Sequence, residues 1–234
     1  MKPKYDDVKN FILDIFYPNR CPCCNNLIKW DKLLCENCID EISGMHDCGF
    51  CFRCGRTPCI CEKQEIFYER AFVYKPYENL VRNAILEMKR GVNVNFGKFS
   101  GIKLAEMLEG TEADFIVPVP MSAKKKHIRR YNQAEIIARQ ISEILDIPVR
   151  NDVLYMKYSK TEQHSRNKED RTAVRNLIGI NDNADIKDSK IILCDDIITT
   201  ANTVNFCSQL LKSKGAFYVV TALSAGAVFK DEDD

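Results

Sequence analysis

The sequence has almost no net charge, no long hydrophobic run and little cysteine outside one short segment. Its 34 lysines and arginines against 33 aspartates and glutamates leave a formal net charge of +1. No overall electrostatic field therefore favours nucleic acid or an acidic membrane surface. No apolar stretch approaches the length of a membrane span, and no secretory signal pattern begins the chain. We predict a cytoplasmic protein without a membrane span.

The cysteines divide the chain into two parts. Ten of the twelve lie between Cys21 and Cys61, and only Cys194 and Cys207 lie elsewhere. A chain of 234 residues is long enough for one domain with a sizeable core and a small appendage. We predict that residues 1–62 form an N-terminal helix, over 5–16, and a zinc-binding module, and that residues 63–234 form the main domain.

The spacing of these cysteines predicts metal binding. Paired Cys-x-x-Cys units in a chain without a secretion signal favour zinc over disulfides. The first predicted site uses Cys21, Cys24, Cys35 and Cys38, and the second uses Cys51, Cys54, Cys59 and Cys61. Cys23 and Cys48 are alternative ligands, and the last pair of the second site is tighter than usual. A complete Cys₄ shell leaves no open position, so we expect one or two structural rather than catalytic zinc ions.

Helices and strands alternate in the rest of the chain. The apolar spacing predicts strands at 71–74, 114–120, 153–158, 191–194 and 217–223, and helices at 78–90, 97–109, 132–145 and 202–214. Such alternation is typical of an α/β fold in which helices cover both faces of a parallel sheet.

Residues 191–203, Ile-Ile-Leu-Cys-Asp-Asp-Ile-Ile-Thr-Thr-Ala-Asn-Thr, carry the clearest functional signal. An apolar run leading into a helix predicts a buried parallel strand, and ligands of open α/β sheets bind at the carboxyl ends of such strands. There Asp195 and Asp196 could accept hydrogen bonds from a sugar diol and lie near Mg²⁺. The turn and the helix N-terminus could bind a phosphate through Thr199, Thr200, Ala201, Asn202 and Thr203. The alternative is a buried strand end with a threonine-rich helix cap.

A second group of candidates follows the strand Val117-Pro-Val-Pro120. Residues 119–139 hold six lysines and arginines against one glutamate. A solvated helix face is the ordinary interpretation of such a basic run. Its position after a strand also favours a loop that binds pyrophosphate. The candidate ligands there are Val119, Arg129, Arg130, Asn132 and Gln133. Asn132 also suits a helix N-cap, with Glu135 in the capping-box position. Gln163 and Arg171 lie in a polar segment, 159–176, which is either a lid over the site or an ordinary surface loop.

The 191–203 segment resembles the phosphoribosyl-pyrophosphate (PRPP) loop of type I phosphoribosyltransferases, except that Ala201 stands where their pattern has glycine. The wider order of motifs is Cys pairs, Val-Pro-Val-Pro, Arg-Arg-Tyr-Asn-Gln-Ala-Glu, Thr-x-Gln, Arg-x(4)-Asn and Cys-Asp-Asp-Ile-Ile-Thr-Thr. This order, over nearly the whole chain, resembles the ComF family of competence-associated proteins with an N-terminal zinc finger.

The resemblance implies a type I phosphoribosyltransferase fold, PRPP or a nucleotide with Mg²⁺ as ligand, and a role in DNA uptake during natural competence. It defines no reaction, because the sequence offers no obvious general base for an acceptor. Two hypotheses stay open. One is an enzyme of pentosyl transfer in which Asp195 and Asp196 hold the ribose. The other is a non-catalytic module that senses PRPP or binds single-stranded DNA, with a competence helicase-like protein as a further partner.

Overall fold

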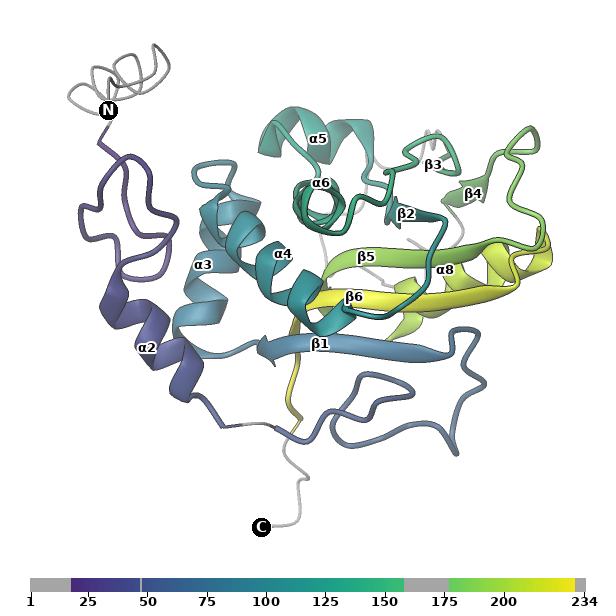
Figure 1. Ribbon diagram of the computed structural model, residues 1–234, viewed down its shortest axis with the longest axis horizontal. Coiled ribbons are helices and arrows are strands. Elements are labelled where there is room, and N and C mark those ends of the chain that lie inside the picture. Colours follow the sequence, from purple (N-terminus) through teal and green to yellow (C-terminus); the bar gives the residue numbers. More distant parts are fainter. Residues whose placement is uncertain (1–17, 47, 158–176, 230–234) are drawn as a thin grey trace, which may run out of the picture.

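The computed structural model of the chain describes residues 18–46, 48–157 and 177–229 (Figure 1). The helix predicted over 5–16 and the segment 159–176, with Gln163 and Arg171, lie outside these residues. No helix within the described ranges is both long enough and apolar enough to cross a membrane.

Four parallel strands form the central sheet, in the order β1-β6-β5-β2. The strands are β1 (Arg70–Pro76), β2 (Phe115–Pro118), β5 (Lys190–Ile198) and β6 (Tyr218–Gly226). This confirms the predicted parallel sheet. Pro118 of β2 pairs in register with Cys194 of β5, so the segments that follow both strands leave the same edge of the sheet.

Helices cover both faces of this sheet. On one face lie α4 (Asn95–Leu108) and α6 (Gln133–Leu145), and on the other lies α8 (Asn202–Ser213) (Figure 1). Successive side chains of β5 alternate between the two cores: Ile192 packs with the residues of α4 and α6, whereas Leu193 packs with those of α8. A strand buried on both sides must be apolar throughout, which explains why residues 191–194 have no polar position.

The first cysteine segment contains a helix that the sequence analysis did not predict. Helix α2 (Glu36–Gly44) buries Cys38 and Ile42, one turn apart, against Val81 and Ile85 of α3 (Asn79–Lys89). Two apolar positions are too weak a periodic signal to identify a helix among turn-forming residues. The first cysteine segment is therefore fixed to α3, beside the sheet (Figure 1).

The second cysteine segment packs directly on the sheet. Its Cys54 and Ile60 belong to the same buried cluster as residues of β1, β5 and α8. The hydroxyl of Tyr68 donates to the Cys54 carbonyl at 2.8 Å, and the N–H of Ala71 donates to the Phe52 carbonyl at 2.8 Å. Residues 51–61 thus share the hydrophobic core of the main domain. The domain boundary between residues 62 and 63 stays a prediction.

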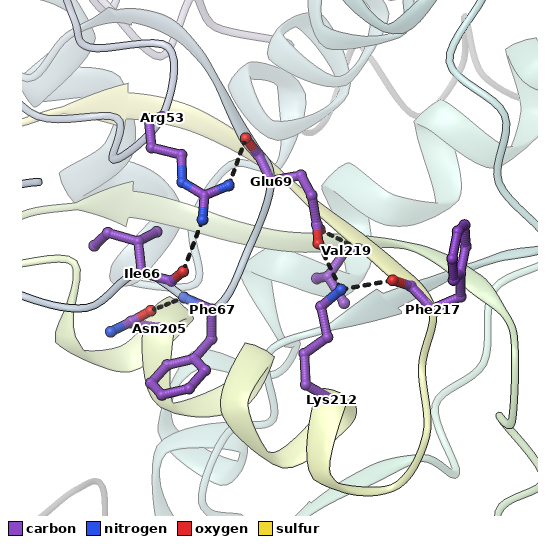
Figure 2. A network of polar contacts seen from close by, with 8 residues as sticks. All are labelled: Arg53, Ile66, Phe67, Glu69, Asn205, Lys212, Phe217 and Val219. Carbon is purple, nitrogen blue, oxygen red and sulfur yellow. Dashed lines mark hydrogen bonds and ion pairs between the residues drawn. The ribbon is translucent and has the colours of Figure 1, made fainter.

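Polar contacts join the segment after the second cysteine cluster to the sheet and to α8 (Figure 2). The Glu69 carboxylate accepts from the N–H of Val219, at 2.7 Å, and from Lys212, at 2.5 Å. The Arg53 guanidinium donates to the Glu69 carbonyl at 3.2 Å, and the N–H of Phe67 donates to the Asn205 side chain at 2.8 Å. These bonds fix α8, whose N-terminus begins just after the predicted phosphate loop.

Two elements were only partly predicted. The strand predicted over 153–158 is β3 (Leu154–Met156), which pairs antiparallel with β4 (Ile178–Ile180) in a separate small sheet. Of the two interpretations of the basic run, a solvated helix face and a loop, the structure has the helix, α5 (Ala123–Arg129). The Ser122 side chain accepts from the N–H of Lys125 and caps this helix, and no residue of α5 is buried. A helix without a buried face leaves no apolar periodicity in the sequence, which is why its bounds were not predicted.

Candidate functional site

Two adjoining hollows lie at the carboxyl edge of the sheet, where β2 and β5 end. The first, of about 170 Å³, is lined by residues 197–204, and we call it the loop cavity. The second, of about 210 Å³, is lined mainly by residues 119–122, by the start of α6 and by the acidic pair, and we call it the basic cavity. Asp195 and Lys125 line both. The site is therefore one depression with two lobes, and Asp195 lies where they meet.

The acidic pair ends the buried part of β5. The carboxylate of Asp195 accepts from the N–H of Asp196 at 2.8 Å. Burial raises the pKa of Asp195 above the usual range of an aspartate, and the neighbouring Asp196 carboxylate raises it further. Asp196 is paired with the ammonium of Lys89, whose Nζ lies 3.2 Å from its carboxylate. Two crowded acids at a ligand-sized hollow are suited to bind hydroxyl donors or a cation.

The turn after β5 provides the wall of the loop cavity. All five residues predicted to bind phosphate line it, namely Thr199, Thr200, Ala201, Asn202 and Thr203. Ala201 is buried and has a φ of 61°, in the left-handed region that favours glycine. The backbone of Ala201 thus has a conformation that glycine adopts more easily than alanine. It leads directly into α8, whose first N–H groups have no intrahelical partner and favour an anion.

The basic cavity brings together four of the five residues predicted around it. Val119, Arg129, Asn132 and Gln133 line it, whereas Arg130 is exposed and is not among its lining residues. The Asn132 side chain accepts from the N–H of Ala134 at 3.2 Å, which confirms the predicted N-cap. Glu135, expected in a capping box, instead forms an ion pair with Arg139 at 2.7 Å.

Gln133 is held by contacts within the protein. Only 1% of its surface is exposed, its amide donates to the Met88 carbonyl at 3.1 Å, and its Oε1 accepts from Arg129 at 3.3 Å. It therefore orients Arg129 and ties the start of α6 to the end of α3. Its direct contact with a ligand stays a prediction.

The sequence analysis did not assign two cations of the site. Lys89 comes from the last turn of α3, distant in sequence from every predicted site residue, and no local motif marks it. Lys125 belongs to the basic run. The sequence shows that this run is positively charged, but it does not indicate which of the three consecutive lysines faces the site. Only the way α5 lies over the sheet edge selects Lys125 as a lining residue.

The cysteines gather as two groups of four, as the spacing predicts. In each group, Cys21, Cys24, Cys35 and Cys38 or Cys51, Cys54, Cys59 and Cys61, the sulfur atoms lie within 4.8 Å of one another. Against the effect of burial, backbone N–H groups lower the pKa of Cys21 to about 7, whereas burial raises the pKa of Cys24 and Cys38 in the same group. Cys23 and Cys48 belong to neither group. Both clusters could hold zinc, and a tetrahedral site needs this set of four thiolates.

Comparisons with known proteins agree with this arrangement. Residues 132–233, which include the acidic pair and the turn after it, match the family described as "Phosphoribosyl transferase domain". The chain is 27% identical over 221 residues to "Competence protein F" of Haemophilus influenzae, which spans 86% of this chain and 93% of that protein. It is 25% identical over 217 residues to "Competence protein ComFC" of Bacillus subtilis, covering 81% of this chain and 82% of that one. Together these matches support the resemblance to the ComF family.

The fold is accordingly of the type I phosphoribosyltransferase kind, with a parallel sheet flanked by helices. Among solved structures it is similar to a purine phosphoribosyltransferase from Pyrococcus horikoshii, at 21% identity and a TM-score of 0.37, over 58% of this chain and 84% of that one.

Proposed function

We propose that this protein binds PRPP, or a nucleotide that carries ribose 5-phosphate, together with Mg²⁺. The observation that carries the proposal is the two-lobed depression, in which an acidic pair separates a helix N-terminus from a cluster of cations. A ligand with a phosphate at one end, a diol in the middle and a pyrophosphate at the other end matches this order of groups.

Each lobe has a role in this proposal. The N–H groups of residues 199–203 and the threonine hydroxyls bind the 5-phosphate. Asp195 and Asp196 accept hydrogen bonds from the ribose hydroxyls. Lys125 and Arg129 bind the pyrophosphate, with Arg129 oriented by Gln133. Gln163 and Arg171, outside the described residues, stay candidates for a covering segment.

The donor set also fits Mg²⁺, because this ion prefers carboxylate oxygens and the oxygens of substrate phosphates. When bound, Mg²⁺ would neutralise part of the ligand's negative charge. The acidic pair would supply carboxylate oxygens to hold it. In the N-terminal part, zinc bound by the two Cys₄ clusters would be structural, since four protein thiolates leave no position for a substrate.

The names of the relatives support a role in natural competence. Because two relatives are called competence proteins and each covers most of this chain, we propose that the protein acts in DNA uptake. Single-stranded DNA and a competence helicase-like protein stay predictions, and no contact among the described residues adds support for either.

Titration calorimetry with PRPP, with and without Mg²⁺, tests the ligand. We expect binding that Mg²⁺ strengthens and that Asp195→Asn weakens strongly. Asp182→Asn is the matched control, because Asp182 is an exposed aspartate outside both cavities. Absence of PRPP binding by zinc-loaded wild-type protein would refute the proposal.

A separate assay addresses turnover. Release of pyrophosphate from PRPP is measured over a panel of nitrogenous bases, with the wild type and Asp195→Asn. Release that depends on a base and is lost in Asp195→Asn identifies an enzyme. Binding without release identifies a sensing module with the same site.

A further inference from the structure

The end of α3 brings a third cation into the basic cavity. Lys89 lines this cavity together with Lys125 and Arg129, and its Nζ lies 3.2 Å from the carboxylate of Asp196. The Asp196 side chain is only 14% exposed, and that of Lys89 is 29% exposed. This is therefore a partly buried pair at a ligand-sized hollow, unlike the exposed pairs that contribute little to stability.

The last turn of α3 is held firmly in this position. The Met88 carbonyl, which precedes Lys89, accepts from the hydroxyl of Tyr131 at 2.9 Å and from the amide of Gln133 at 3.1 Å. Just beyond the helix, Gly91 has a φ of +76°, and a Cβ there would lie 2.7 Å from the Arg129 carbonyl oxygen. The backbones that carry Lys89 and Arg129 are thus in contact, so the two cations keep a fixed relation.

The ion pair with Asp196 does not use the full binding capacity of Lys89. An ammonium group has three N–H donors, and one contact with a carboxylate oxygen occupies one of them. The same ammonium that contacts the Asp196 carboxylate can also bind a phosphate oxygen at the cavity. The position of Lys89 therefore suits a group shared between the acidic pair and an anionic ligand.

We propose that Lys89 is a binding residue for the pyrophosphate group, shared between Asp196 and the ligand, and that it determines preference for PRPP over ribose 5-phosphate. The inference rests on the proposed function. It assigns Lys89 to the basic cavity alone, because Lys89 is not among the lining residues of the loop cavity, where the 5-phosphate would bind. Pyrophosphate alone should also depend on it.

Binding of three probes to Lys89→Met, Lys89→Arg and wild type tests the assignment. The probes are PRPP with Mg²⁺, pyrophosphate with Mg²⁺, and ribose 5-phosphate. A charged hydrogen bond of typical strength predicts a loss of about tenfold to a hundredfold for PRPP and pyrophosphate in Lys89→Met. Ribose 5-phosphate should bind within about threefold of wild type, and Lys89→Arg should recover most of the lost affinity.

The control is Lys98→Met, because Lys98 is an exposed lysine of α4 outside both cavities. Thermal melting verifies that each variant is folded. If Lys89→Met does not fold, Lys89→Gln is used in its place. Equal losses for PRPP and ribose 5-phosphate would mean that Lys89 acts only through Asp196 on the shared ribose, and this would overturn the assignment, as would no loss at all. Failure of the wild type to bind any probe would instead refute the proposed function.

Discussion

The packing of the second cysteine segment on the sheet can be tested at Gly55. Gly55 has a φ of +71°, and a Cβ built there would lie 2.8 Å from the Cβ of Ala71 and 3.1 Å from the Cδ1 of Ile198. The Ala71 methyl group cannot move away, because it is fixed to the backbone of β1. Gly55→Ala should therefore force the cysteine segment and the sheet apart.

The magnitude follows from two terms. A left-handed backbone costs a residue with a Cβ about 1–2 kcal/mol, and inserting a methyl group into a packed core costs about 1–3 kcal/mol. Gly110 provides the matched control, because it has a φ of +77° and no atom within 4 Å of its added Cβ. Gly110→Ala carries only the backbone term, so the two variants should differ by about 1–3 kcal/mol, the overlap term alone.

Urea denaturation with zinc present measures this difference as free energies of unfolding. The same variants are then titrated with ribose 5-phosphate, because Ile198 immediately precedes the predicted phosphate loop. We expect Gly55→Ala to weaken this binding and Gly110→Ala to leave it unchanged. Equal destabilisation by the two substitutions would show that residues 51–61 do not pack closely on β1 and β5, and the reasoning would be wrong.

Three other predictions concern the loop, the metal and the acidic pair. Ala201→Gly should raise the affinity for ribose 5-phosphate measured by calorimetry, because it removes a buried methyl group and the strain of a φ of 61°; unchanged affinity would contradict this. Elemental analysis should find about two zinc ions per chain, and a chelator should lower the melting temperature, because structural zinc contributes folding energy. Asp195→Asn should stabilise the protein at pH 7. The raised pKa of Asp195 means that the folded state keeps a proton which the unfolded state loses, so wild-type stability falls as the pH rises above about 4. Urea denaturation at pH 5 and pH 8 should show a smaller decrease in the variant.

The parts of the fold that were predictable from the sequence are those with strong local signals. The apolar run Ile191–Cys194 is typical of a strand buried on both faces of a parallel sheet, and it forms part of β5. The amphipathic stretch 202–214 becomes α8. The spacing of the cysteines predicts both groups of four, because two closely spaced cysteine pairs, Cys-x-x-Cys in all cases but Cys59-x-Cys61, can place four sulfurs around one point. In each case a short segment contains the whole physical argument.

The elements that were missed or only partly predicted lack such a signal. Helix α5 has no buried side chain, and β4 has only three residues, so neither leaves a periodic pattern. Lys89 could not be assigned either, because its role depends on how α3 is placed against β5. Gln133 shows the reverse case. It was predicted from a motif to contact a ligand. In the structure its amide donates to the Met88 carbonyl at the end of α3, so packing between α6 and α3 accounts for its position.

The two cysteine clusters support different walls of the same depression. The first packs through α2 on Val81 and Ile85 of α3, the helix whose last turn carries Lys89 into the basic cavity. The second packs beneath β1 and against Ile198, at the entrance of the loop cavity. A four-strand sheet alone leaves the ends of α3 and β5 without support on these sides. Because each cluster fixes the backbone behind one group of binding residues, metal bound there would act on ligand affinity through position rather than through contact.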